Sequence, residues 1–282
     1  MNRATLQQRL RAGRGFVFDM DGTLVLGDRK GTGHHALPGA IELLAHLRTR
    51  GLPWVAFTNG TAHTPAHCAG LLRHAGFALE DAQMLTPSVS AAEFFVQEGL
   101  QRILVLGCEG VWRPLEAAGL EVVLPPAADP KVEAVYLGWY REFTMPDLEL
   151  ACAAVWAGAA LFTASHVPFF ATATGRGIGT SFAMAEMIRA LTGKRARVLG
   201  KPARAALCCA ARHLGLKASE LDSLVVVGDD PLLEMTMARS GKALAIGVTT
   251  GLNDRASFER QPVARRADLV VDGLAELATL LD

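Results

Sequence analysis

Short apolar runs alternate along the chain with longer segments in which apolar residues recur at helical spacing. The helical spacing predicts helices over residues 39–50, 65–75, 89–98, 146–157, 181–192, 203–213 and 232–240. The apolar runs predict strands that begin at Gly15, Trp54 and Leu224, and strands over residues 103–107, 132–137, 160–164, 243–248 and 269–271. Strands that alternate with helices in this way are typical of an α/β protein with a parallel sheet.

Two aspartates lie at the end of the first predicted strand. The segment from Gly15 to Leu24 is an apolar run that carries Asp19 and Asp21, with Gly22 directly after them. Residues just past the carboxyl end of a parallel strand lie where open α/β sheets bind ligands, and side chains two apart on an extended chain point the same way. We therefore expect both carboxylates to point toward the same binding site. A divalent cation would relieve their repulsion, and oxygen-only ligands favour Mg²⁺.

Two further segments place polar residues directly after apolar ones. Thr58 follows the second strand, and its hydroxyl and the N–H groups of Asn59 and Gly60 can hold phosphate oxygens. Lys201 follows an apolar pair, and Pro202 suits the first position of the next helix. We expect Lys201 beside the two aspartates, where it would offset carboxylate and phosphate charge.

A fourth segment adds more acids. The strand that begins at Leu224 ends in Asp229 and Asp230, and Glu234 follows one helical turn further on. Asp229 is the natural third ligand for a cation that the first two aspartates hold.

In order and spacing, these four segments resemble those of the haloacid dehalogenase superfamily over nearly the whole chain. Leu37-Pro38-Gly39-Ala40 before a helix, the early Thr58-Asn59 and the long insert before Lys201 resemble the NagD-like, or p-nitrophenylphosphatase-like, subfamily IIA. The resemblance implies an Mg²⁺-dependent phosphatase of small phosphate esters. It also implies an α/β fold with a Rossmann-like parallel-sheet core and an inserted α/β cap domain of the C2 type, and a phosphorylated aspartate as the intermediate.

The resemblance also implies a role for individual residues. Asp19 corresponds to the nucleophile and Asp21 to the general acid and base. The phosphate-binding groups are expected to be Thr58, Asn59, Gly60 and Lys201. The metal ligands are expected to be Asp19, Asp21 and Asp229.

The chain departs from the subfamily pattern at two positions. Glu234 stands where a second aspartate is usual, and Ala164-Ser165-His166 replaces the usual Asn-x-Asp after a cap strand. Mg²⁺ demands short, near-octahedral contacts, so we expect Glu234, like Asp230, to lie outside the direct ligands. There it would hold a metal-bound water or orient Lys201.

The length and charge of the chain narrow the class of partner. The 282 residues, half of them hydrophobic, can form a large core, and Lys plus Arg and Asp plus Glu are equal at 28 each. We predict a catalytic core over residues 1–84 and 180–282 and a cap over 85–179. We expect a small phosphate ester as partner, no nucleic acid and no membrane, and a cytoplasmic location; a homodimer is left open.

The cap is expected to select the substrate. The candidates for contacts with it are Trp139, Tyr140, Arg141, His166, Phe169, Phe170 and Arg176, with core packing or a solvated charge as the alternative for each. Of these, His166 stands where the subfamily carries an acid, which would favour a more anionic substrate.

Several other features have plain structural explanations. The five cysteines form no disulfide or zinc pattern, and we expect Cys208 and Cys209 in a helix core. Residues 175–180, which are rich in glycine, are expected to form a turn between cap and core that caps the helix beginning near Ser181. His63 and His67 are expected on an exposed helix face, and the roles of the neighbouring histidines 34 and 35 are left open.

Two other functions stay open. The first is a catalytically weakened member of the superfamily that binds or regulates, which Glu234 suggests. The second is a phosphomutase, which the position of the large insert disfavours. A dehalogenase that attacks carbon is disfavoured by Asp21, because such enzymes lack an acid at that position.

Overall fold

The computed structural model describes residues 3–27, 33–127, 131–172 and 175–281, and the chain forms two compact units. The first unit comprises Met1–Thr58, Ala66–Leu85 and Lys201–Asp282. The second comprises Asn59–Pro65 and Thr86–Gly200, so it lies between parts of the first along the chain. Within the described ranges, no helix combines the length and the apolar character needed to cross a membrane.

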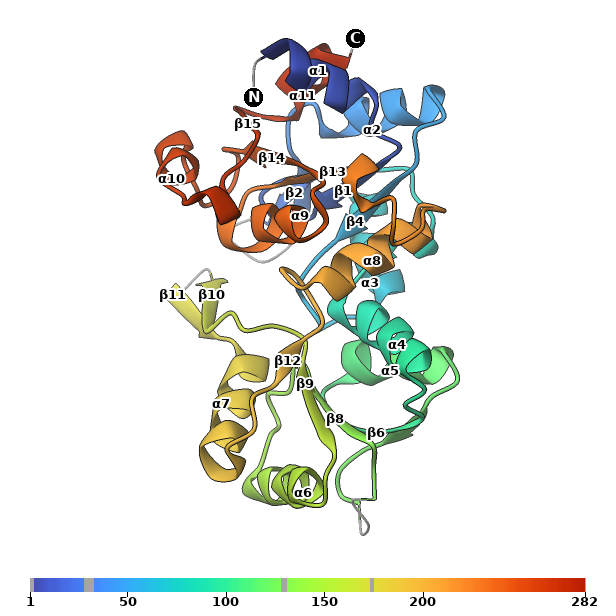
Figure 1. Ribbon diagram of the computed structural model, residues 1–282, viewed down its shortest axis with the longest axis vertical. Helices are drawn as coiled ribbons and strands as arrows, with labels where there is room; N and C mark the ends of the chain where they lie inside the picture. The colour runs from blue at the N-terminus through green and yellow to red at the C-terminus, as the bar shows by residue number, and fades with distance from the viewer. Residues whose placement is uncertain (1–2, 28–32, 128–130, 173–174, 282) are drawn as a thin grey trace. The chain divides into compact units, whose positions relative to one another are not determined.

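A parallel sheet forms the centre of the first unit (Figure 1). Its strands, in spatial order, are β15 (Leu269–Val271), β14 (Leu244–Val248), β13 (Leu224–Gly228), β1 (Gly15–Asp19), β4 (Trp54–Phe57) and β5 (Met84–Leu85). In the middle of the sheet, Val17 of β1 pairs with Val226 on one side and Val55 on the other. The prediction of a parallel-sheet α/β fold is confirmed.

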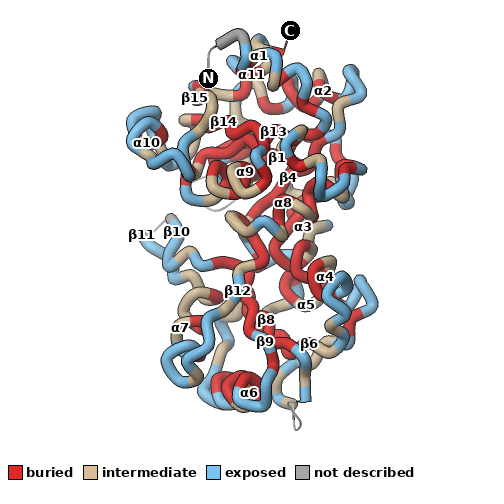
Figure 2. The backbone as a smooth tube through the Cα atoms, in the orientation of Figure 1, coloured by how far each residue is buried: buried red, intermediate tan, exposed pale blue. Residues whose placement is uncertain are grey.

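Helices surround this sheet and cover its apolar side chains. They are α1 (Arg3–Arg11), α2 (Ala40–Thr49), α3 (Pro65–His74), α8 (Arg204–His213), α9 (Thr236–Gly241), α10 (Arg255–Glu259) and α11 (Leu274–Leu281). Short helical turns occur at η1 (Asp81–Gln83), η2 (Leu221–Ser223), η3 (Pro231–Met235) and η4 (Val263–Arg265), and η3 is a π-helix. Phe16 and Phe18 stack with ring centroids 6.1 Å apart in the core beneath the helices. Figure 2 shows the strands of this sheet as buried along most of their length.

The start of α2 explains the glycine in Leu37-Pro38-Gly39-Ala40. Gly39 adopts a left-handed conformation with φ 80°, and a Cβ atom there would lie 2.5 Å from the backbone nitrogen of Ala275. Only glycine permits both the backbone angle and the close approach of α11.

A small antiparallel hairpin follows β1. It consists of β2 (Val25–Gly27) and β3 (His34–Ala36), with Val25 opposite Ala36 and Gly27 opposite His34. The sequence pattern did not predict this hairpin, because its strands are only three residues long.

The second unit has a parallel sheet of its own. In spatial order its strands are β12 (Arg197–Val198), β9 (Ala160–Thr163), β8 (Ala134–Leu137), β6 (Arg102–Leu106) and β7 (Glu121–Val123). The helices are α4 (Pro87–Glu98), α5 (Glu109–Ala117), α6 (Met145–Trp156) and α7 (Thr180–Thr192). A separate antiparallel hairpin is formed by β10 (Phe169–Thr172) and β11 (Gly175–Ile178).

The second unit differs from the expected cap at its carboxyl end. Residues 180–200 were predicted to belong to the core, but they lie in the second unit, as do residues 59–65. The reason is pairing and packing, since β12 joins the sheet beside β9 and α7 packs against α6. The glycine-rich segment was also interpreted wrongly, because Gly175–Ile178 is a strand rather than a turn.

Most predicted helices are present, and four others were missed. The missed helices are α1, α5, α10 and α11. Pro114 interrupts the helical pattern of α5, and α10 has only five residues, so neither leaves a clear periodic signal. The predicted helix over 232–240 is divided into η3 and α9, and Pro202 precedes α8 by two residues instead of beginning it.

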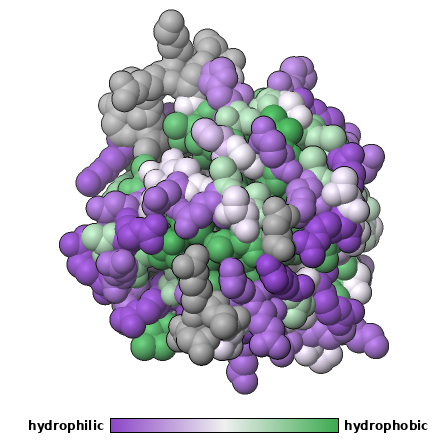
Figure 3. Space-filling view, turned by 90° about the horizontal axis from the view of Figure 1, so that it is seen from above, coloured by the Kyte–Doolittle hydropathy of each residue, from purple (hydrophilic) through white to green (hydrophobic). Residues whose placement is uncertain are grey.

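The face of the molecule in Figure 3 carries mostly hydrophilic side chains, with apolar ones scattered between them. This is the ordinary composition of a surface in contact with water.

Candidate active site

The acids of the first motif lie at the carboxyl end of β1, as the sequence predicted. Asp19 is the last residue of the strand and is buried, whereas the Asp21 side chain is 61% exposed. Thr23 donates a hydrogen bond of 3.3 Å from Oγ1 to Asp19 Oδ2. Burial raises the pKa of Asp19 and the charge of Asp21 adds to this effect, while Lys201 opposes it.

Lys201 forms the centre of the site. Its side chain is 1% exposed, and its Nζ donates to Asp19 Oδ1 at 2.5 Å and to the carbonyl oxygen of Phe57 at 2.7 Å. Glu234 Oε1 lies 2.7 Å from the same nitrogen. Burial by itself would lower the pKa of Lys201, but the carboxylates of Asp19 and Glu234 outweigh it and raise that pKa. The buried ammonium therefore stays charged.

Glu234 reaches Lys201 from the π-helical turn that follows β13. Its Oε2 accepts a hydrogen bond of 3.1 Å from the backbone nitrogen of Asp230, so both carboxylate oxygens have a partner. A Cβ atom at Gly228 would lie 2.2 Å from Glu234 Cγ, so the long side chain occupies space that only glycine leaves open. Burial raises the pKa of Glu234 to about 8, with Lys201 acting in the opposite direction.

Asp229 is fixed by the loop after β14. Its Oδ2 accepts a hydrogen bond of 3.0 Å from the backbone nitrogen of Leu252, and Asn253 Nδ2 donates to its carbonyl oxygen at 3.1 Å. A Cβ atom at Gly251 would lie 1.8 Å from Oδ2. Burial, followed by the charge of Asp19, raises the pKa of Asp229 to about 7. Two buried carboxylates that disfavour each other's ionisation have the donor chemistry that a hard cation requires.

The remaining acids have other partners. Asp230 caps η3, because its Oδ1 accepts a hydrogen bond of 2.7 Å from the backbone nitrogen of Leu232. Asp21 Oδ1 lies 3.6 Å from His34 Nε2 in the hairpin after β1. Among the described residues, the predicted ligands Asp19, Asp21 and Asp229 do not bring one carboxylate oxygen each within 4.8 Å of the others.

The predicted phosphate-binding residues other than Lys201 lie where the chain passes from the first unit to the second. Thr58 is buried in the first unit, where its backbone nitrogen donates to the carbonyl oxygen of Leu85 at 3.2 Å. Asn59 and Gly60 follow directly along the chain and are counted with the second unit.

Among the predicted specificity residues of the second unit, Phe170 and Arg141 both lie beside Trp139, and Arg176 and Phe169 form a separate contact. The Trp139 ring lies 5.6 Å from that of Phe170, and the guanidinium of Arg141 lies 6.0 Å from the Trp139 ring. The guanidinium of Arg176 lies 4.4 Å from the ring of Phe169. Phe169 and Phe170 are adjacent in β10, so their side chains project from opposite faces of the hairpin.

Another predicted specificity residue, His166, lies against α7. Its ring is 6.4 Å from that of Phe182, and it borders a groove of about 380 Å³ with Glu186, Arg189 and Arg195. Burial lowers the pKa of His166, and the charge of Glu186 opposes this effect.

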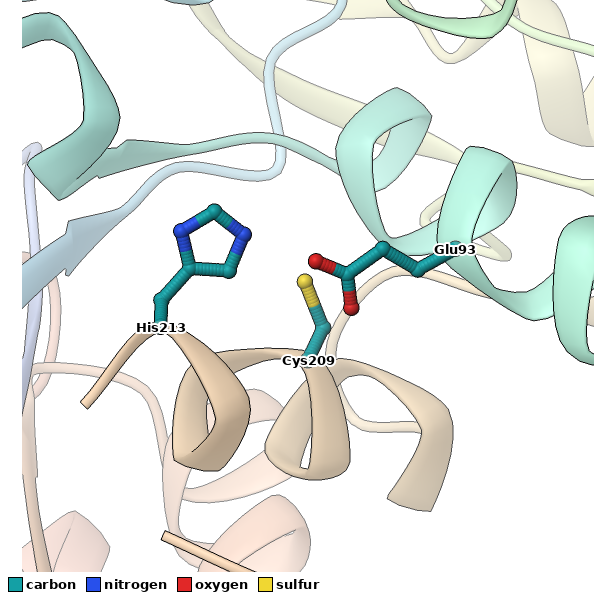
Figure 4. Close-up of side chains that lie close together, drawn as sticks. All are labelled: Glu93, Cys209 and His213. Atoms are coloured by element: carbon teal, nitrogen blue, oxygen red, sulfur yellow. The ribbon is translucent and has the colours of Figure 1, made fainter. Parts of the chain in front are cut away.

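The other singled-out histidines and cysteines have mixed outcomes. His67 lies exposed on α3 as expected, but His63 precedes that helix. Cys209 is buried on α8 as predicted, whereas Cys208 is only partly buried. His213 follows Cys209 one turn later on the same helix (Figure 4). Glu93, also drawn in Figure 4, belongs to α4 of the second unit.

Sequence reasoning missed two groups of site residues. Thr23 was visible in the first motif but received no role, although its hydroxyl contacts Asp19. The loop with Gly251, Leu252 and Asn253 carries no recognisable motif, and only the fold brings it to Asp229.

The sequence matches known families in two segments. Residues 16–121 match the model of the haloacid dehalogenase-like hydrolases, and residues 198–277 match a second model described as HAD-hydrolase-like. Chronophin of Mus musculus is 26% identical over 286 residues, a match that covers 97% of this chain and 95% of that protein. The D-glycerol 3-phosphate phosphatase of Mycobacterium tuberculosis is 29% identical over 239 residues, covering 84% of this chain and 63% of that protein.

Solved structures share the fold. The 4-nitrophenylphosphatase of Thermotoga maritima superposes with a TM-score of 0.84 at 24% identity, covering 97% of this chain and 99% of that one. The glycerol phosphate phosphatase of Mycobacterium tuberculosis in complex with magnesium gives a TM-score of 0.82 at 26% identity, covering 97% of this chain and 79% of that one.

Proposed function

Because the chain belongs to the haloacid dehalogenase-like hydrolases, we propose that it is an Mg²⁺-dependent phosphatase that hydrolyses small phosphate monoesters through a phosphorylated Asp19. The observation that carries this proposal is the buried Lys201, whose Nζ contacts Asp19 at 2.5 Å and Glu234 at 2.7 Å. Burying a charged group costs free energy, and such groups are found mainly at functional sites. Here the buried ammonium lies beside the carboxylate that would attack phosphorus.

Asp19 is the proposed nucleophile. Its carboxylate forms a bond to phosphorus while the bond from phosphorus to the leaving oxygen breaks. Lys201 and Thr23 hold its two oxygens, which limits the orientations from which it can attack. Water then attacks the phosphorus, the bond to Asp19 breaks, and inorganic phosphate leaves.

Asp21 is the proposed acid and base. It gives its proton to the departing alkoxide and later removes a proton from the hydrolytic water. The exposure of its side chain suits this exchange, since a group that gains and loses a proton in each cycle needs access to solvent.

The carboxylates of Asp19 and Asp229 fit a hard cation, and they would hold Mg²⁺. When bound, the ion would neutralise charge on the phosphoryl oxygens. Support comes from the glycerol phosphate phosphatase relative, which was crystallised with magnesium. The Asp21 carboxylate, which is 61% exposed, is available for proton transfer.

The second unit is proposed to select the substrate. Its two pairs of guanidinium and aromatic ring, Arg141 beside Trp139 and Arg176 beside Phe169, would favour an anionic substrate with an apolar part. A member that binds without hydrolysing was suggested by Glu234, but the contact of Glu234 with Lys201 gives this glutamate a use in catalysis.

A screen of phosphate monoesters with and without Mg²⁺ tests the proposal. We expect hydrolysis of at least one small monoester, its loss in EDTA and its recovery on adding Mg²⁺. Asp19→Asn is the matched inactive control. A wild type that hydrolyses no ester at saturating Mg²⁺ would reject the proposal.

A further inference from the structure

The hairpin of β2 and β3 contains two adjacent histidines, and it places His34 close to Asp21 of the first motif. His34 Nε2 lies 3.6 Å from Asp21 Oδ1, and the His34 side chain is only 25% exposed. Cross-strand pairing explains why His34, rather than His35, lies close to Asp21. Gly27, Val25, His34 and Ala36 share one face of the hairpin, on which Val25 is fully buried. His35 and its partner Leu26, which is 50% exposed, share the other face.

The backbone around Asp21 is fixed, but its side chain is not. Asp21 forms a bridge with Val25, the nitrogen of Gly22 donates to the carbonyl oxygen of Val25 at 2.8 Å, and Thr250 Oγ1 donates to the carbonyl oxygen of Gly22 at 2.6 Å. The Asp21 carboxylate is 61% exposed, so packing does not select its rotamer. A group that transfers a proton in the transition state must be held in place.

We infer that His34 is a positioning residue that holds Asp21 Oδ1 and thereby directs Asp21 Oδ2 toward the leaving oxygen. This inference rests on the proposed function and adds a residue to it. The separation of 3.6 Å exceeds a hydrogen bond, and such contacts often shorten only when substrate is bound. An N–H group at Nε2 that donates to Oδ1 leaves Oδ2 to carry the proton. His34 itself loses and gains no proton in this role.

Two aryl esters of nearly the same shape separate proton transfer from binding. Phenolate is a much poorer leaving group than p-nitrophenolate, so phenyl phosphate depends more on the acid. The quantity to compare is kcat/KM, which includes departure of the leaving group whichever later step limits turnover.

We expect His34→Ala to lower kcat/KM for phenyl phosphate about 10-fold and that for p-nitrophenyl phosphate by less than about 3-fold, a part of what a general acid contributes. His35→Ala is the matched control on the opposite face and should change neither value. His34→Gln, whose amide nitrogen reaches as far as Nε2, should restore most of the loss. His34→Asn, which is shorter, should not.

Equal losses for both esters, or equal behaviour of the Gln and Asn variants, would overturn the inference. The Gln and Asn pair decides the matter even where the alanine variant does not fold, because both keep a polar side chain in the hairpin. An active wild type that is indifferent to His34 rejects only this inference. A wild type inactive on all esters rejects the proposed function itself.

Discussion

Glu234 Oε1 lies 2.7 Å from Lys201 Nζ, and both side chains are almost completely buried. Glu234 stands where an aspartate is usual in the subfamily that this chain resembles. Its extra methylene lets it reach Lys201, which also contacts Asp19. The space for it comes from Gly228, which has no Cβ. The substitution in the motif is thus matched by a specific contact with the buried Lys201.

We predict that Glu234→Asp lowers kcat about 10-fold or more and changes the apparent affinity for Mg²⁺ only modestly. The shortened side chain falls short of Lys201, and groups that orient a catalytic or ligand residue typically change activity by about 10 to 100-fold. Titration with Mg²⁺ of wild type and variant measures both effects. Glu259→Asp, at an exposed position, is the control. A variant more active than a nearly inert wild type would identify a protein that binds rather than hydrolyses.

Asp229→Ala should cause a severe loss that added Mg²⁺ does not recover at ordinary concentrations. Asp229 is buried and held by the backbone nitrogen of Leu252, so no neighbouring carboxylate can take its place without rearranging the loop. The same Mg²⁺ titration measures this outcome. Near-normal activity with a small shift in apparent affinity would exclude Asp229 as a direct ligand.

Asp19→Asn should abolish turnover while the protein stays folded. The amide has nearly the same shape as the carboxylate but is a poor nucleophile, so we expect activity toward p-nitrophenyl phosphate to fall by about 10³-fold or more. Circular dichroism and thermal unfolding check the fold, and Asp222→Asn, at an exposed position, is the control. Substantial remaining hydrolysis would contradict the covalent mechanism.

Asp21→Asn should affect esters according to their leaving groups. An alkyl phosphate needs its leaving oxygen protonated, whereas p-nitrophenolate departs with little help, so kcat/KM should fall more for the alkyl ester. The ratio of the two losses is the measurement. A ratio of one would show that Asp21 is not the acid.

His166→Ala should change the ranking of substrates more than it changes hydrolysis of p-nitrophenyl phosphate, which needs few specific contacts. Lost binding of this kind appears mainly in KM. Arg176→Ala, which removes the guanidinium beside Phe169, serves as a comparison. An equal change for every substrate would remove His166 from the specificity residues.

The metal-free protein should lose stability as pH rises from about 4 to 8. The pKa of Asp229 is raised from 3.8 to about 7 and that of Glu234 from 4.5 to about 8, so the folded state binds more protons than the unfolded state between these values. Their contribution is fully present below the unfolded values and is lost as pH rises through the folded ones. Melting temperatures measured in EDTA across this pH range test the expected loss of stability.

The Asp229→Asn variant isolates the effect, because an amide does not ionise. Its melting temperature should fall less between pH 5 and pH 8 than that of wild type. Mg²⁺ should raise the melting temperature of wild type more at pH 8 than at pH 5, since it binds the ionised carboxylates. Parallel pH curves for wild type and variant would contradict the raised pKa of Asp229.

The parallel-sheet fold and the position of the acids at strand ends could be predicted from local sequence patterns. These features are local, because an apolar run followed by polar residues specifies both a buried strand and what lies beyond its carboxyl end. Asp19, Thr58 and Asp229 were predicted in this way, and each lies at or directly after the end of its strand. Their catalytic roles came from the family resemblance and remain proposals.

The contacts between distant side chains became visible only in the folded chain. Lys201 and Glu234 are 33 positions apart, and their contact depends on the π-helical turn and on the space at Gly228. The choice of His34 over His35 depends on the register of a hairpin too short to leave a periodic pattern. Residues 180–200 joined the second unit because β12 pairs with β9. The pairing of distant strands and the conformations of individual side chains depend on the whole folded chain. Local sequence patterns therefore do not predict them.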